Sequence, residues 1–462
     1  MSPGARLAAI SLIAAGCTAS AQDVQPHPDQ ITYPTGLAVS PDDKVLFVAE
    51  ANSDLEYDSG QIGIVDLDLA DSIISGWVSS AKTVPDGCSQ DTDHLETLIC
   101  DETPFLHQTA GVRVGNFTTT IAIEHQDDKT RLIIPTRGDP SITWVDWDGT
   151  NLNCNTSGLQ FDICDDAHRL SFLYGDADQT PLPAEPYDAF ADAVNGFAVV
   201  THQSTGSVTL VDSPLDSQDV QITDIILDEF APDALTGLPG ATGVAGRTPS
   251  VADGDMVYVG SRSEDRVQTY SVERPGNASP PFLSRDNFFF LDSVGSYAGS
   301  STDTRGMTFS SDGSRLYLVN RNPPSLQIYD TSASDTGFPK NTLVGATDLC
   351  RQGSTVDVLD TGDGDRAYIV CFGDGEVYVV DPRGTSQVSD IITVGRGPYA
   401  ATASVGRKRL YVSNFLEDTI AVIDIDPLSA TRDRVVLRIG VPKPPDKVNT
   451  STTGTYLPGG FF

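Results

Sequence analysis

Arginine side chains recur at one point of a repeated segment and could bind an anion. Each stands two to four residues before a stretch of apolar character that we expect to form a strand. The guanidinium group offers a planar pair of N–H donors that suits a carboxylate or a phosphate. The sequence predicts an anion-binding site, and the alternative is that each arginine pairs with an Asp of the neighbouring repeat. The residues are Arg247 in GRTPS, Arg305 in TRGMT, Arg351 in CRQGS and Arg396 in GRGPY.

Three tyrosines, Tyr33, Tyr187 and Tyr399, stand at similar points of the repeat. An aromatic side chain has a broad apolar face and a polar tip, so it can stack on a sugar or contact a peptide. Packing against neighbouring strands is the alternative role. We include the three tyrosines in the predicted binding site.

Two clusters of acidic side chains place oxygen atoms close together on predicted turns, as Ca²⁺ requires. The first contains Asp146, Asp148 and Asn151, and the second lies between Asp360 and Asp365. Neither has the spacing of an EF-hand loop, and the second falls where a plain hairpin turn is expected. The prediction is a protein without a cofactor, with Ca²⁺ at the first cluster as the alternative.

The sequence carries no local catalytic motif. The G-x-S-x-G, H-E-x-x-H and P-loop patterns are missing, and the six histidines are scattered. We therefore expect a non-catalytic binding or scaffold module. A hydrolase or lyase of the lactonase type, with a site assembled from distant repeats, is the alternative.

A repeated pattern of strands runs through most of the chain. Each repeat has a β-rich run, such as VLFVAEA from Val45 or RLYVSNF from Arg409, followed by a strand such as VTLVD or IAVID. Seven repeats of four strands predict an all-β, seven-bladed β-propeller over residues 34–442, because sheets that are apolar on both faces must stack around an axis. In this fold the predicted binding residues gather at one mouth of the central channel. The recurring strands cover 62–66, 142–146, 208–212, 267–271, 326–330, 377–381 and 420–424.

Six of the seven cysteines form an even set without a C-x-x-C pattern, which favours disulfides over zinc. The economical pairing joins sequence neighbours. Two of these pairs fall in predicted insertions, 71–110 and 149–186, which are either binding surfaces or decoration. The third would staple the first two strands of the sixth blade. The pairs are Cys88 with Cys100, Cys154 with Cys164, and Cys350 with Cys371.

The phrases LYVSN, LYLVN and LFVAE, together with SPDD or SSDG turns and a closing VID, resemble the YVTN-type β-propeller repeats of exported bacterial proteins. The resemblance covers about residues 34 to 442 and implies the propeller fold. The superfamily includes surface-layer proteins, binding modules, a lactonase branch and haem-carrying reductases, so the resemblance leaves the function open.

The N-terminal residues are similar to a bacterial lipoprotein signal. Residues 1–16 contain Arg6, then an apolar run, and end in Ala-Ala-Gly before Cys17. This predicts a lipidated Cys17, a tether over 17–33 and an outer-membrane lipoprotein of the bacterial cell envelope, facing the periplasm or the surface. A secreted or soluble periplasmic protein is the alternative. Residues 443–462 are predicted to be an extended tail.

The charge of the chain limits its partners. There are 64 acidic residues against 29 Lys and Arg, and the formal net charge is −35. Such a chain is not expected to bind nucleic acid, because the phosphate backbone attracts basic surfaces. The expected partners are the membrane, through the lipid anchor, and a protein segment or anionic glycan. We expect a monomer.

Overall fold

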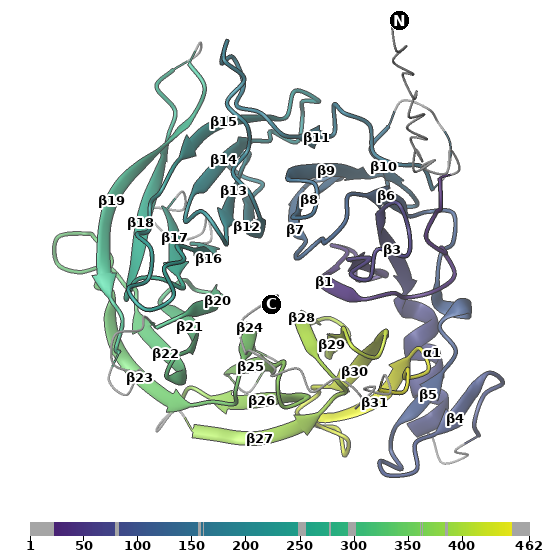
Figure 1. The fold of residues 1–462 in the computed structure, drawn as a ribbon. Helices are drawn as coiled ribbons and strands as arrows, with labels where there is room; N and C mark the ends of the chain where they lie inside the picture. The colour runs from purple at the N-terminus through teal and green to yellow at the C-terminus, as the bar shows by residue number, and fades with distance from the viewer. Residues whose placement is uncertain are drawn as a thin grey trace, which may run out of the picture.

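The protein is a ring of seven antiparallel sheets around a central channel (Figure 1). The computed structural model describes residues 23–78, 83–155, 159, 161–247, 256–276, 279–293, 302–360, 362, 364–383 and 387–445. Each sheet is one blade, and its innermost strand is the first one along the chain. The prediction of a seven-bladed β-propeller is confirmed.

The first two blades follow the repeat pattern with insertions, and blade 3 is a plain four-stranded sheet. Blade 2 gains a fifth strand, β11, which pairs with β9. Blade 1 contains β1 (Pro34–Val39), β2 (Val45–Glu50), β3 (Gly60–Asp66) and β6 (Val112–Val114); blade 2 contains β7 (Ala122–Gln126), β8 (Lys129–Thr136), β9 (Ser141–Trp147), β10 (Leu152–Asn153) and β11 (Arg169–Leu170); blade 3 contains β12 (Pro186–Asp192), β13 (Phe197–His202), β14 (Val208–Asp212) and β15 (Gln221–Ile226).

Blades 4 to 7 each contain the complete four-stranded unit, and the sheet of blade 7 is extended by two further strands. Blade 4 contains β16 (Ala241–Gly246), β17 (Met256–Ser261), β18 (Arg266–Glu273) and β19 (Phe282–Phe290); blade 5 contains β20 (Thr304–Phe309), β21 (Arg315–Arg321), β22 (Pro324–Asp330) and β23 (Thr342–Asp348); blade 6 contains β24 (Gly353–Asp360), β25 (Asp365–Cys371), β26 (Glu376–Asp381) and β27 (Gln387–Thr393); blade 7 contains β28 (Pro398–Ser404), β29 (Arg409–Asn414), β30 (Thr419–Asp424) and β31 (Arg434–Ile439).

The second strand of each blade is the centre of the core, because both of its faces pack against neighbouring blades. The burial pattern of β2, β13 and β17 is continuous rather than alternating. In blades 4 to 7 the same position of this strand is a tyrosine, and all four rings are buried. A strand buried on both faces is expected to read as a near-continuous apolar run, and the repeats do so. The four tyrosines are Tyr258, Tyr317, Tyr368 and Tyr411.

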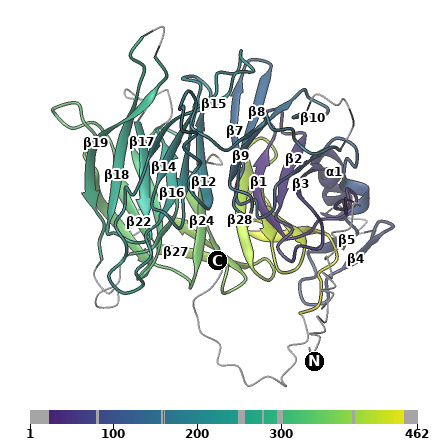
Figure 2. The same ribbon diagram turned by 45° about the horizontal axis from the view of Figure 1, so that its top comes forward.

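The ring is closed by an insertion of blade 1 that joins the sheet of blade 7. This insertion contains helix α1 (Leu67–Val78), strands β4 (Cys88–Gln90) and β5 (Leu98–Cys100), and the 3-10 helix η1 (Thr103–Phe105). Strand β5 pairs in parallel with β31, so blade 7 has six strands. Figure 1 shows α1 at the rim between these two blades, and Figure 2 shows it beside β2 and β3. The first predicted insertion therefore joins the first blade to the last, and we call it the clasp.

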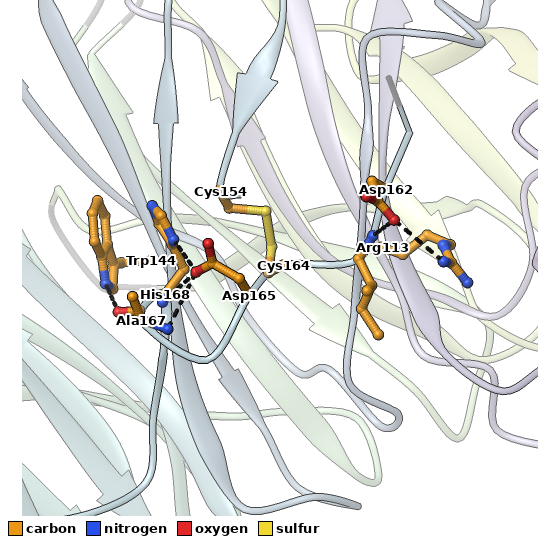
Figure 3. The surroundings of a disulfide bond; sticks show 9 residues. Arg113, Trp144, Cys154, Asp162, Cys164, Asp165, Ala167 and His168 are labelled. Atoms are coloured by element: carbon orange, nitrogen blue, oxygen red, sulfur yellow. Dashed lines mark hydrogen bonds and ion pairs between the residues drawn. A yellow bond between two sulfur atoms is a disulfide. The ribbon is translucent and has the colours of Figure 1, made fainter. Parts of the chain in front are cut away.

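The second insertion ties blade 2 to blade 1. In Figure 3 the Cys154–Cys164 disulfide lies between His168 and Trp144 on one side and Arg113 of β6 on the other. The backbone N–H of Arg113 donates to Asp162 at 2.9 Å, and the N–H of Cys164 donates to the carbonyl of Arg113 at 3.0 Å. The loop thus runs as an extra edge beside β6.

The predicted disulfides are all present. Cys88–Cys100 staples β4 to β5, and Cys350–Cys371 holds the start of β24 to the end of β25. Disulfides of this kind belong to an oxidising compartment, extracellular or periplasmic. No helix within the described residues is long and apolar enough to cross a bilayer.

The predicted tether packs on the propeller over the part that the structure describes. The carboxylate of Asp23 lies 2.7 Å from Arg113, and Ile31 is buried in the core between blades 1 and 7. The backbone N–H of Thr32 donates to Glu50 at 2.8 Å. Residues 23–33 therefore lie against blade 1 because they have partners there. Residues 1–16, Cys17 and most of the predicted tail lie outside the described residues.

Candidate binding site at the channel mouth

One backbone hydrogen bond is repeated in all seven blades at the same end of the channel. The residue that ends or follows the second strand donates its N–H to the carbonyl of the residue just before the innermost strand. In blade 2 the acceptor is Phe117, which stands at the equivalent point of the repeat. The distances are between 2.9 and 3.2 Å. The donors are Ala51, Arg137, Gln203, Arg262, Arg321, Phe372 and Phe415, and we call this set the mouth ring.

The mouth ring is uneven in its chemistry. Blades 2, 4 and 5 contribute Arg137, Arg262 and Arg321, whereas blades 6 and 7 contribute Phe372 and Phe415. Blade 3 contributes an amide and blade 1 only a methyl group. The symmetric fold therefore presents positive charge on one side of the mouth and aromatic rings on the other.

Two of the residues whose carbonyls accept these bonds are acidic, and their carboxylates lie beside arginines. Glu185 and Asp303 precede β12 and β20 with φ of 52° and 51°, a left-handed conformation that is costly for residues with a Cβ. The turn carries Glu185 to Arg137 of blade 2, where Oε1 and Nη2 are 3.0 Å apart. It carries Asp303 to Arg305 of its own blade, with Oδ1 and Nε 2.8 Å apart.

Tyr187, Arg305 and Tyr399 meet below the mouth ring. Each is the second residue of an innermost strand, in blades 3, 5 and 7. Tyr187 interacts with both the Arg305 guanidinium and the Tyr399 hydroxyl and raises the pKa of each group. Smaller residues occupy the equivalent position elsewhere, and their hydroxyls donate to a carbonyl of the next blade. These smaller residues are Thr35, Thr119, Thr242 and Ser354.

Burial shapes the ionisation of this group. Burial, and then the neighbouring Tyr187, raises the pKa of Tyr399 well above its ordinary value, so this phenol stays protonated. Burial acts to lower the pKa of Arg305, but Asp303 and Tyr187 outweigh it and the pKa is raised. Burial and the nearby Arg305 lower the pKa of Arg321 to about 10 and also lower the pKa of Arg262. All these arginines remain charged near neutral pH.

A pocket of about 380 Å³ opens at the mouth over blades 7, 1 and 2, with Glu185 of blade 3 at its wall. This volume is within the range of small-molecule sites, about 300–1,000 Å³. Its aromatic side is Phe415, whose ring lies 5.3 Å from Tyr33 and 6.1 Å from Tyr399. Other lining residues include Phe117, Thr118, Arg137 and Glu185.

Two polar atoms at the pocket have no protein partner. The Thr118 hydroxyl and the Arg137 Nε are buried and make no hydrogen bond. Buried polar groups in native structures almost always find a partner. Both atoms are hydrogen-bond donors, so an oxygen acceptor that reached them would complete their hydrogen bonding.

The seven residues predicted from the sequence separate into three groups. Arg305, Tyr187 and Tyr399 come together at the mouth, with Tyr33 beside Phe415. Arg351 and Arg396 precede innermost strands as expected, but they pair with Asp374 and Glu417 of their own blades, both at 3.2 Å. The Arg351 side chain is 82% exposed.

Arg247 lies at the opposite end of the channel, and its predicted place was wrong. The innermost strand of blade 4 is ATGVAG, before this arginine, and not the segment after it. Arg247 is buried there and donates to the carbonyl of Thr331 at 3.1 Å.

Arg137, Arg262 and Arg321 were not predicted, although the repeats contain a signal for them. The runs IIPTR, YVGSR and YLVNR each end in an arginine at the same position. That position faces the mouth only because the second strand pairs antiparallel with the innermost strand.

The acidic clusters use their oxygens within the protein. Asp146 binds the buried Arg131 at 2.7 Å, and Asp148 accepts the backbone N–H groups of Thr150 and Asn151. Asp360 accepts two N–H groups of its hairpin turn, and Asp363 lies outside the described residues. Within the described residues, no group of three His, Cys, Asp or Glu side chains is arranged as a metal site.

Two carboxyl groups line the channel deeper than the pocket. Asp188 follows Tyr187 in β12 and accepts the N–H groups of Ala189 and Val244 at 3.0 and 3.3 Å. Burial raises the pKa of Asp188 to about 7 and also raises the pKa of Asp357 in β24. Both residues are half-buried.

The fold is shared with solved bacterial propellers of low sequence identity. A protein of Lactobacillus plantarum is 14% identical with a TM-score of 0.53, covering 84% of this chain and 94% of its own. The periplasmic gluconolactonase of Pseudomonas aeruginosa is 12% identical with a TM-score of 0.50, covering 79% and 87%. Hydrazine synthase of Kuenenia stuttgartiensis is 12% identical with a TM-score of 0.51, covering 87% and 97%. At such identities the likeness shows the fold alone.

No protein-family model and no curated protein matches the sequence. The chain is thus defined as a seven-bladed β-propeller with bacterial structural neighbours, and membership of the YVTN-type group stays a prediction.

Proposed function

We propose that the protein is an exported, lipid-anchored binding module whose channel mouth takes up an anionic group of a glycan or protein segment. The observation that carries the proposal is the concentration of positive charge at one point of a very acidic chain. Arg137, Arg262, Arg305 and Arg321 gather at the mouth with the carboxylates of Glu185 and Asp303. A local positive field of this kind attracts anions, whereas the acidic remainder of the surface repels them.

The pocket adds a surface for the rest of the ligand. The Phe415 and Tyr399 rings form an apolar wall opposite Arg137, and the Thr118 hydroxyl is available as a donor. A sugar ring with a charged substituent fits this combination, because sugars use an apolar ring face and hydroxyl oxygens together. A chain end with a free carboxylate fits it as well.

A thermal-shift panel tests this proposal. Galacturonate, gluconate, glucose 6-phosphate and a short peptide with a free C-terminus would be added at low and high salt. We expect stabilisation by anions that weakens in salt and is lost in Arg137→Gln. Arg351→Gln is the matched control, since Arg351 is far more exposed and lies outside the pocket. No stabilisation by any of these anions would contradict the proposal.

The anchor is the second part of the proposal. Lipidation at Cys17 would hold the propeller at the outer membrane of a bacterial envelope, facing the periplasm or the surface, as a monomer. Membrane fractionation of the full chain and of Cys17→Ser checks this. Recovery of both proteins in the soluble fraction would favour a secreted or periplasmic form.

A hydrolytic function is the second candidate, and Asp188 is the observation that favours it. A carboxyl group with a pKa near 7 can take a proton from an attacking water at neutral pH. Opening of gluconolactone by the purified protein, compared with Asp188→Asn, distinguishes the two functions. Equal rates in both proteins and in buffer would rule out this role of Asp188.

A further inference from the structure

We propose that Glu185 occupies, in the free protein, the place at Arg137 that a carboxylate of the ligand takes on binding. Glu185 then sets the affinity of the pocket and selects ligands that bear a carboxylate. This inference rests on the proposed function of the channel mouth and assigns its specificity to one ion pair.

Arg137 is held firmly, while its Nε donor has no hydrogen-bond partner. Its backbone N–H donates to Phe117 at 3.1 Å, and its side chain is 19% exposed. The next residue is Gly138, where a Cβ would lie 2.4 Å from the Phe117 ring, so the backbone packs tightly there. The Nη2 atom binds Glu185, whereas Nε is buried without a partner. A carboxylate that bound both atoms would satisfy the fork.

Glu185 can leave this position at low cost. Its side chain is 35% exposed at the pocket wall and comes from blade 3, whereas Arg137 belongs to blade 2. The pair is only partly buried, so it is weaker than a deeply buried ion pair. When a ligand carboxylate replaces Glu185, Arg137 keeps an anionic partner and the displaced group is solvated. The exchange therefore leaves no buried charge unpaired.

Asp303 at the equivalent position of blade 5 shows the contrast. It has nearly the same φ and also binds an arginine, but its partner Arg305 is only 4% exposed and belongs to the same blade. Removal of Asp303 from Arg305 would uncover a deeply buried charge, which is strongly unfavourable. Of these two equivalent pairs, the one between Glu185 and Arg137 can exchange.

The test compares galacturonate with its methyl ester, which keeps the ring and loses the charge. Isothermal titration of the full chain and of Glu185→Gln should give a roughly three- to tenfold tighter Kd for galacturonate in the variant, with the ester changed by less than about twofold. Asp374→Asn removes a carboxylate from the exposed Arg351 and is the charge-matched control. Its affinity for galacturonate should match that of the wild type.

The outcomes separate the inference from the proposed function. Binding of galacturonate to the wild type with an equal or weaker affinity in Glu185→Gln would overturn the inference, because Glu185 would then position Arg137. An equal gain for the ester would also overturn it. Absence of binding in the wild type and in both variants would overturn the inference together with the proposed carboxylate site.

Discussion

Arg407 of blade 7 forms an ion pair with Asp71 of α1, with Nη1 and Oδ2 2.5 Å apart. The same guanidinium also binds Asp68 and the backbone carbonyls of Leu67 and Asp43. All these partners belong to blade 1 or to its insertion. One side chain of the last blade therefore joins the two ends of the propeller.

The first prediction concerns this contact between blade 7 and blade 1, which we call the seam. Arg407→Gln should lower the free energy of unfolding by about 1–3 kcal/mol, because several partly buried acceptors lose a charged donor. Chemical denaturation measures the change. Arg383→Gln is the control, since Arg383 is half exposed and binds Asp381 of its own blade; we expect a change within about 0.5 kcal/mol. Equal effects of the two variants would contradict the role of the seam.

The second prediction concerns Tyr187. Tyr187→Phe should lower stability by about 1–3 kcal/mol, because the buried Arg305 guanidinium and the Tyr399 hydroxyl both lose a polar group that interacts with them. Tyr399→Phe leaves the interaction between Tyr187 and Arg305 in place and should cost less, about 1 kcal/mol. Urea denaturation of both variants gives the order. A larger effect of Tyr399→Phe would show that Tyr187 is not the central polar group of this cluster.

The third prediction concerns two buried glutamates. Burial raises the pKa of Glu50 and of Glu124 to about 8, against about 4.5 for an exposed glutamate. The folded protein keeps protons that the unfolded chain has released, so their contribution to stability is complete below pH 4.5 and is lost as the pH rises toward 8.

Glutamine replaces the protonated acid without titrating. Glu50→Gln and Glu124→Gln should therefore be more stable than the wild type at pH 8.5, by about 1 kcal/mol or more, and should show a flatter loss between pH 5 and 8. Thermal unfolding across this pH range measures both. Glu273→Gln on the surface controls for the reduced net charge. An unchanged slope in the two core variants would contradict the prediction.

The sequence was enough to predict the blades, because the apolar runs and turns of each repeat determine its strands locally. The β-rich runs became the buried second strands, and the short cysteine spacings allowed the correct disulfides. The clasp was not predictable in this way. Its contact between β5 and β31 joins segments more than 330 residues apart, as in the hydrogen bond from Thr97 to Val435. Nothing in the residues 88–100 alone specifies that partner.

The site was predicted in part. Tyr187, Tyr399 and Arg305 share one position in the repeat, and symmetry brought them together as expected. Arg247 failed because ATGVAG, a segment of small residues, is the innermost strand of blade 4. Arg137, Arg262 and Arg321 were missed because they stand at the end of the second strand. They face the mouth only through the antiparallel pairing of that strand with the innermost one, and the repeat pattern alone does not show which end of the channel they reach.

The crystal structure of the protein, determined from a crystal soaked in galacturonate, tests most directly whether a ligand carboxylate binds Arg137 in place of Glu185. We expect the sugar carboxylate within hydrogen-bond distance of Arg137, the sugar ring against Phe415, and Glu185 turned away from the arginine. An empty pocket with the Arg137–Glu185 pair intact, or a sugar bound elsewhere on the ring, would contradict it.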